Sequence, residues 1–152
     1  MPTTVKKETT KPAAAHHAAK PAKSDRYIEA IGRRKTAIAR VRIVNGTGKV
    51  SVNGKESGQY FVTPRIAAAA LAPLDDLKIR ETFDVSAKVS GGGIKAQAEA
   101  IRLGIARAIV EKNEAWKKRL RVSGYLTRDP RMVERKKYGL KKARRRPQWA
   151  KR

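Results

Sequence analysis

The residues with the strongest chemical character lie at the C-terminal end of the chain. Between Val133 and Arg152 a single acid, Glu134, accompanies ten basic residues: Arg135, Lys136, Lys137, Lys141, Lys142, Arg144, Arg145, Arg146, Lys151 and Arg152. Like charges at this density repel one another, and few apolar side chains are present to form a core, so the segment cannot order by itself. The pattern predicts a polyanionic partner, and RNA is the first candidate.

Two aromatic residues, Tyr138 and Trp149, stand among these cations. Unpaired RNA bases stack on aromatic rings while Arg and Lys bind the phosphates, although such rings can also anchor a segment in a protein groove. Gly139, Pro147 and the lack of apolar periodicity favour an extended tail over a helix. The residues from Leu140 onward would span up to roughly 45 Å if fully extended, which is well beyond a small domain.

Two further clusters of cations lie upstream of the tail. Arg33, Arg34 and Lys35 follow Gly32 in an expected tight connection, where they favour a phosphate contact over a merely solvated turn. A second cluster mixes both signs of charge, and its acids are expected to hold its arginines in place through salt bridges. It consists of Arg128, Asp129, Arg131, Glu134 and Arg135.

The triplet Gly91, Gly92 and Gly93 separates an expected strand from an expected helix. Backbone N–H groups and the helix dipole at such a junction can hold an anion. The triplet lacks the Lys-Ser/Thr ending of a P-loop and the spacing of a dinucleotide fingerprint. It therefore favours a structural turn that touches an RNA phosphate over a nucleotide-binding loop.

The chain offers few residues of the types that catalyse reactions. The chain has no cysteine, its only histidines are His16 and His17 near the N-terminus, and its carboxylates stand mostly singly apart from Asp75 and Asp76. We therefore expect no enzyme activity, no metal site and no cofactor.

The overall composition excludes several other classes of protein. Lys and Arg number 37 against 13 Asp and Glu, a formal charge of +24, which favours phosphate polymers. No apolar run approaches the roughly 20 residues of a spanning helix, so no membrane partner is expected. The lack of cysteine, of a secretory signal and of an Arg-rich presequence suits the cytoplasm.

Hydrophobic periodicity predicts the elements that carry these clusters. Alternation indicates strands over residues 27–31, 37–44, 50–52 and 79–89, with turns at Asn45-Gly46 and Asn53-Gly54 that would make a hairpin of unequal strands. Spacings of three and four indicate helices over residues 64–77, 94–111 and 114–121, the first ended or kinked by Pro73. The fold class is α+β, a small mixed sheet packed with helices.

Three segments follow from this pattern. Residues 1–25 are expected to be a disordered arm rich in Lys, Ala and Pro, residues 26–126 a globular α+β domain, and residues 127–152 an extended basic tail.

Several motifs stand in a specific order and spacing along the chain. They are Gly32-Arg33-Arg34-Lys35-Thr36 with Ala39-Arg40-Val41; Gly91-Gly92-Gly93 with Gln97, Ala100, Ile101-Arg102 and Gly104-Ile105-Ala106-Arg107-Ala108; Thr127-Arg128-Asp129; Val133-Glu134-Arg135-Lys136-Lys137; Gly139-Leu140-Lys141-Lys142-Ala143-Arg144-Arg145; and Lys151-Arg152. Together they resemble the family of the ninth protein of the bacterial small ribosomal subunit. The resemblance covers about residues 26–152.

The resemblance implies a compact α+β domain that binds 16S rRNA in the head of the small subunit, among neighbouring ribosomal proteins. It implies a tail that reaches the decoding region, where Lys151 and Arg152 would contact the tRNA in the peptidyl site. The expected rRNA contacts are Arg33, Arg34, Lys35, Arg128, Arg131, Arg135, Lys136, Lys137, Lys141, Lys142, Arg144, Arg145, Arg146 and Trp149. Family members often carry Tyr or Phe and then Ser where this chain has Trp149-Ala150, so a hydroxyl is missing here.

Two other functions suit parts of the same pattern. A histone-like compactor of nucleic acid would use the same charge and would bind DNA indiscriminately. A small-molecule phosphotransferase would need a base and metal-binding carboxylates near Gly91–Gly93, and the nearest acid upstream is Asp84.

Overall fold

The computed structural model describes residues 27–151 and confirms the α+β class. Its strands are β1 (Ile28–Arg34), β2 (Ala37–Asn45), β3 (Val50–Val52), β4 (Lys55–Glu56) and β5 (Phe83–Ser90). Its helices are α1 (Ser57–Tyr60), α2 (Pro64–Leu77), α3 (Ile94–Lys112) and α4 (Lys117–Val122), with short 3-10 turns at Arg80–Thr82 and Glu114–Trp116. The predicted arm at residues 1–25, with His16 and His17, and the terminal Arg152 lie outside the described residues.

The strands form one five-stranded sheet in the order β1-β2-β5-β3-β4. Neighbouring strands are antiparallel except β3 and β5, which run parallel. The strands β1 and β2 make a tight hairpin, and Lys35 in its turn takes a left-handed conformation with φ of 51°. The motif 32–35 is thus the end of a strand and its turn rather than a separate loop.

The predicted hairpin between residues 37–44 and 50–52 is wrong, because β5 lies between β2 and β3. The strand β5 alternates over its whole length and pairs with β2 from Ile38↔Ser90 to Asn45↔Phe83, which leaves the short β3 only the far edge. The connecting loop is fixed by Asp84, whose Oδ1 accepts hydrogen bonds from the backbone N–H groups of Thr47 and Lys49, each at 2.8 Å. These bonds lower the pKa of the Asp84 carboxyl.

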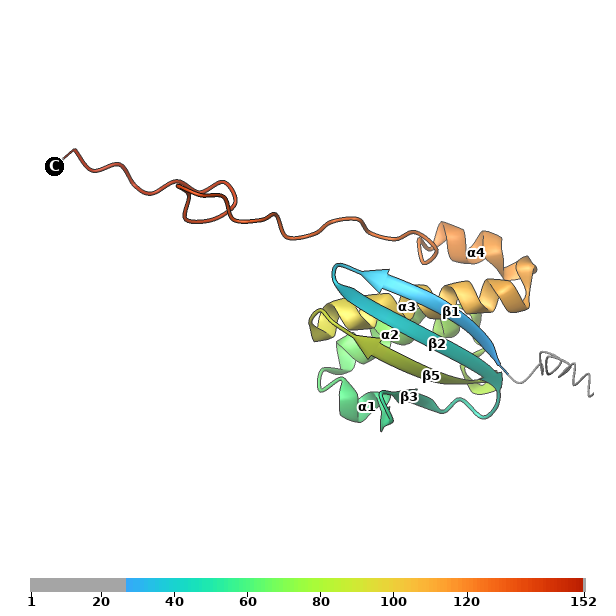
Figure 1. Cartoon of the computed structure of the whole chain (residues 1–152). Helices are drawn as coiled ribbons and strands as arrows, with labels where there is room; N and C mark the ends of the chain where they lie inside the picture. The colour runs from blue at the N-terminus through green and yellow to red at the C-terminus, as the bar shows by residue number, and fades with distance from the viewer. Residues whose placement is uncertain (1–26, 152) are drawn as a thin grey trace, which may run out of the picture.

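One face of the sheet packs on α2 and α3, which lie behind it in Figure 1. The inward residues of β2 are Ala37, Ala39, Val41 and Ile43, all buried, and α3 adds the apolar side predicted for it, including Ile101, Ile105 and Ile109.

The helix α3 crosses β1 at glycine. A Cβ atom on Gly32 would lie 1.8 Å from the carbonyl oxygen of Ala100 and 2.6 Å from the backbone nitrogen of Gly104. Only a residue without a side chain allows the helix backbone to come this close.

Several predicted boundaries need correction. The strand expected from Ile79 begins only at Phe83, because residues 80–82 form a 3-10 turn. The helix predicted over residues 64–77 is confirmed as α2, so of the two effects expected of Pro73 the helix end is wrong; α2 stops at Lys78, where φ is 58°. The ring of Pro73 is buried in the core, and this packing offsets the hydrogen bond that proline cannot donate.

The tail leaves the domain beside α4 and extends away from it to the C-terminus (Figure 1). Its course is extended except for one loop, in which the backbone N–H of Lys141 donates to the carbonyl of Arg145 at 2.7 Å and Gly139 has φ of 71°. Across residues 27–151, no helix is both long and apolar enough to cross a membrane.

The close approach of α3 to β1 gives a test of the fold. Gly32→Ala would drive a methyl group into the backbone of α3, so we expect the free energy of unfolding to fall by about 3 kcal/mol. Urea denaturation of the full chain, followed by circular dichroism, measures this loss. Gly58→Ala is the matched control, because no atom lies within 4 Å of a Cβ at Gly58; equal stability of the two variants would contradict the packing.

Candidate RNA interface

Three segments that are distant in the sequence meet at the hairpin end of the sheet. The glycine turn lies against the β1–β2 hairpin, since a Cβ on Gly91 would be 2.6 Å from the carbonyl oxygen of Thr36 and one on Gly92 would be 2.9 Å from Cβ of Ala37. The start of the tail, at residues 129–131, contacts Arg34. The fold therefore brings together the hairpin cluster, the glycine turn and Arg131, all predicted from the sequence as site residues.

The glycines of the turn have a structural explanation. Gly91 and Gly92 have φ of 71° and 66°, a region that residues with a side chain rarely adopt. The side chain of Gln97 donates to the carbonyl of Gly91 at 3.0 Å and accepts from the hydroxyl of Tyr60 at 2.7 Å, which fixes the turn above the first turn of α3. Anion binding at Gly91, Gly92 and Gly93 stays a prediction.

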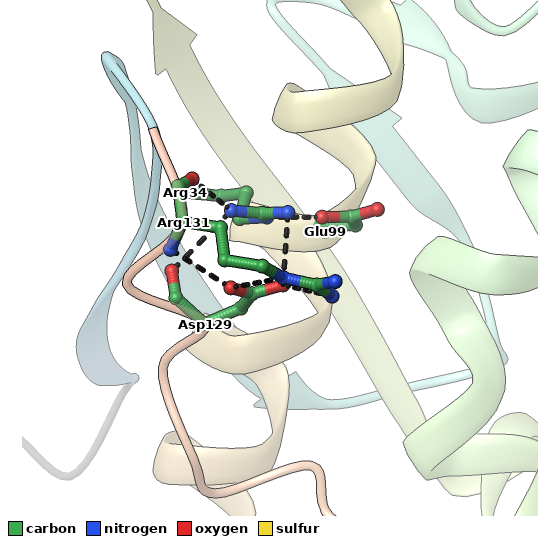
Figure 2. Close-up of polar contacts among 4 residues, drawn as sticks. All are labelled: Arg34, Glu99, Asp129 and Arg131. Carbon is green, nitrogen blue, oxygen red and sulfur yellow. Dashed lines mark hydrogen bonds and ion pairs between the residues drawn. The ribbon is translucent and has the colours of Figure 1, made fainter. Parts of the chain in front are cut away.

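Arg34 forms the centre of an ionic cluster (Figure 2). Its Nε lies 2.5 Å from Oε2 of Glu99 on α3, and its Nη2 lies 2.9 Å from Oδ2 of Asp129. Its Nη1 donates to the backbone carbonyl of Arg131 at 2.7 Å. With a side chain only 11% exposed, Arg34 joins the hairpin, α3 and the start of the tail.

Asp129 is held from a second side by Arg131. The backbone N–H of Arg131 donates to Oδ1 at 2.9 Å, and its Nη2 donates to Oδ2 at 2.8 Å. The hydrogen bonds from Arg131, together with the nearby Arg34 guanidinium, hold the pKa of the Asp129 carboxyl well below its usual range. The expectation that an acid here holds arginines in place is confirmed at Asp129.

A polar groove surrounds the ionic cluster, between the hairpin, α3 and the start of the tail. Its cations other than Arg34 are Lys35, Lys95, Arg102 and Arg131. Arg34 and Arg131 use hydrogen bonds on Asp129, whereas Lys35 and Lys95 are exposed and make no ion pair within residues 27–151. The groove thus offers cations to an anionic ligand while its carboxylates are occupied.

Sequence reasoning missed three contributors to this groove. Lys95, Glu99 and Arg102 lie on the polar side of α3, and a polar side of a helix is ordinarily just solvated. A partial signal was present, because Lys95 and Arg102 share that side with Arg107 and follow directly on the glycine turn.

The expected contacts of the tail lie on an exposed segment. Those that the structure describes are Arg128, Arg135, Lys136, Lys137, Lys141, Lys142, Arg144, Arg145, Arg146, Trp149 and Lys151, all of them exposed. Glu134 pairs with Lys137 at 3.1 Å and with Arg144 at 2.9 Å, rather than with Arg135, and so closes the loop of the tail. The ring of Trp149 is 79% exposed.

Within residues 27–151 no group of three or more His, Cys, Asp or Glu side chains is placed to hold a metal ion. A compact α+β domain with a cationic groove and an exposed basic tail defines the class: a basic protein built to bind a polyanion.

Comparison with known proteins gives the family. Residues 32–152 match the family described as ribosomal protein S9/S16. The small ribosomal subunit protein uS9 of Cyanothece sp. is 51% identical over 123 residues, which cover 80% of this chain and 89% of the relative. The proteins of the same name from Amoebophilus asiaticus and Prochlorococcus marinus are each 49% identical and cover 82% and 80% of this chain, and 98% and 89% of their own lengths.

The chain belongs to the ribosomal protein S9/S16 family. It is a structural constituent of the small ribosomal subunit, and the family is one of ribosomal structural proteins rather than of enzymes. The resemblance found in the sequence is confirmed.

The ionic cluster predicts that Arg34 fixes the start of the tail. Arg34→Gln should broaden the distance distribution between spin labels on cysteines introduced at Gly58 and Val133, because the contacts to Asp129 and to the carbonyl of Arg131 are lost. The chain has no cysteine of its own, so only the two introduced cysteines carry the spin label. Arg33→Gln is the matched control, since Arg33 points to the opposite face of β1; equal broadening in both variants would refute the role of Arg34.

The depressed pKa of Asp129 gives a second prediction. Since the folded-state pKa lies below the unfolded value, the contacts of Asp129 stabilise the fold above about pH 4 and are lost only as the pH falls towards the folded value. In an NMR titration, the carboxyl resonance of Asp129 should stay constant where exposed aspartates titrate. Arg131→Gln should raise the pKa towards the ordinary value, and an unchanged titration in that variant would show that Arg131 is not the main cause.

Proposed function

We propose that the domain binds 16S rRNA in the head of the small subunit and that the tail extends to the tRNA in the peptidyl site, where Lys151 and Arg152 contact its phosphates. The proposal rests on where the tail places its basic residues. The tail extends away from the domain (Figure 1), and its basic residues from Arg135 to Lys151 are exposed.

The two parts of the molecule suit two kinds of contact. The groove of Lys35, Lys95, Arg102 and Arg131 is held rigidly by the hairpin, α3 and the Arg34 cluster, so it presents cations at fixed spacings. Such an array suits a folded RNA whose phosphates also have fixed positions. The proposed rRNA contacts of the tail instead follow the RNA surface as an extended strand.

Cations at the end of a long tail suit a ligand that changes at every elongation step. A Lys or Arg that contacts phosphate grips any tRNA regardless of its sequence, and the guanidinium of Arg152 can bind phosphate through two hydrogen bonds. The loop closed by Glu134 shortens the reach of the tail below its extended length. Opening that loop would lengthen the tail without any change in the domain.

The proposal includes the surroundings of the protein. Its partners are 16S rRNA, the peptidyl-site tRNA and neighbouring proteins of the small subunit, in the cytoplasmic ribosome. It includes no membrane, cofactor or catalytic step.

The test replaces the terminal cations. Small subunits reconstituted with Lys151→Gln/Arg152→Gln should bind peptidyl-site tRNA about ten-fold more weakly, because about 1.4 kcal/mol of charge-assisted contact is lost. Filter binding of labelled tRNA to purified subunits measures the loss, and sedimentation checks that the subunits assemble normally.

The control removes the same charge from a part of the chain outside the proposed contacts. Lys118→Gln/Arg121→Gln changes two exposed cations of α4 and leaves the tail intact, so tRNA affinity should stay near that of the unmodified subunit. Unchanged tRNA affinity in the terminal variant, or equal losses in the two variants, would refute the role of the last two residues.

A further inference from the structure

The sheet has a second face that no described element covers. The helices α2 and α3 lie behind the sheet, and its other face is open in Figure 1. Along β1, β2 and β5 the outward residues alternate with the buried ones of the core, and they include Ile31, Ile38 and Val44, which are 43%, 42% and 42% exposed. Ile31 and Ile38 are diagonal neighbours across the β1–β2 pair, so they form one small apolar patch on this face that a partner can cover.

The open face carries more cations than acids. Its cations are Arg33, Arg40, Arg42 and Lys88, and its acids are Glu29 and Asp84. Both acids are occupied: Glu29 accepts from Arg40 at 2.6 Å and from Arg42 at 2.7 Å, and Asp84 accepts from the loop after β2. Arg33 and Lys88 make no ion pair within residues 27–151.

Two of these cations oppose each other directly. Arg40 of β2 is the cross-strand partner of Lys88 of β5. Arg40 has Glu29 of β1 as its ion-pair partner, whereas Lys88 has no acid partner within residues 27–151 and faces a cation across the strands. A bound anion at Lys88 would supply the missing negative charge.

A shallow groove runs beside this pair. It is lined by Ile38, Arg40, Asn53, Lys88, Val89 and Ser90. The side chain of Asn53 donates to the carbonyl of Val89 at 3.1 Å and accepts from its N–H at 2.8 Å, which satisfies the edge of β5 where β3 has ended. The groove therefore presents an aliphatic side chain, a hydroxyl and two cations rather than a free strand edge that would pair with another protein.

We propose that the open face of the sheet, centred on Ile38, Arg40 and Lys88, is a docking surface for ribosomal RNA. Phosphates lie between Arg40 and Lys88, and sugars pack on Ile31 and Ile38. This surface deepens the proposed function, because it names a second side of the domain that holds rRNA. It meets the hairpin groove at Arg33 and Lys35, so the RNA contact runs from the open face around the hairpin to the start of the tail.

The test measures RNA affinity and stability in the same variant. Lys88→Gln in the full chain should weaken binding to bacterial 16S rRNA transcribed in vitro about three- to ten-fold at 0.1 M KCl and reduce the slope of log K against log [KCl] by about 1. The same substitution should not lower the Tm of the free protein, because Lys88 makes no ion pair within residues 27–151 and faces a cation across the strands. A lysine with a purely structural role would lower the Tm.

Two further variants separate local contact from general charge. Lys118→Gln on α4 removes the same charge away from the open face and should leave affinity nearly unchanged. Ile38→Thr keeps the charge and the β propensity and should weaken binding without changing the salt slope.

Three outcomes would count against the proposal in different ways. Affinity and slope equal to the unmodified chain in both Lys88→Gln and Ile38→Thr would overturn the docking surface and leave the proposed function intact. Unchanged RNA binding with lost association to another small-subunit protein would assign the face to a protein partner instead. Failure of the unmodified chain to prefer 16S rRNA over duplex DNA of equal length would count against the proposed function itself.

Discussion

The close contact between α3 and β1 is the constraint on which the rest of the structure depends. Because Gly32 has no side chain, the backbone of α3 lies against the strand at Ala100 and Gly104. Two residues along the strand Arg34 faces the same side, and it meets Glu99 of the helix. The hairpin, the helix and the start of the tail therefore share one junction, and the position of the tail depends on a packing contact inside the domain.

Within residues 27–151, several acids hold cations and loops in place. Each of five acids is occupied by hydrogen bonds or ion pairs: Glu29, Asp84, Glu99, Asp129 and Glu134. A carboxylate occupied in this way does not repel phosphate as strongly as a free one, while the surrounding lysines and arginines still attract it. Pairing leaves the net charge unchanged at +24, but it fixes where the cations beside these five acids stand.

Much of the fold could be predicted where the hydrophobic pattern is long. The alternation of β2 and β5 and the spacing of Ile101, Ile105 and Ile109 in α3 state which side faces the core, and the structure confirms these elements. The pairing of β3 could not be predicted, because a strand of three residues is too short for its sequence to indicate a partner. Its partner in the sheet is β5, which is not the nearest strand in the sequence. The helix α1 and the strand β4 are too short for any period to be visible.

The candidate site was predictable by residue type but not by role. The cations of the hairpin and tail stood out as a cluster, yet only the register of β1 shows that Arg33 points outward and Arg34 inward to Glu99 and Asp129. Lys88 gave no signal at all, since a single lysine in an alternating strand is the ordinary outward residue of a half-buried sheet. Its significance comes from its partner across the strands, which a sequence does not state.

An extended basic tail and a folded basic domain suit different kinds of recognition. A tail without fixed spacing binds any polyanion, and its affinity comes mostly from released counterions, so alone it would not distinguish rRNA from DNA. A domain whose cations are held by strands and by the Arg34 cluster favours an RNA with matching phosphate positions, because a mismatched one leaves cations unpaired. The Arg34 cluster couples the two, since it sets where the unselective tail begins relative to the selective domain. Under the proposed function, selectivity of the whole chain would therefore depend in part on Arg34, whose described contacts are to Glu99, Asp129 and the carbonyl of Arg131.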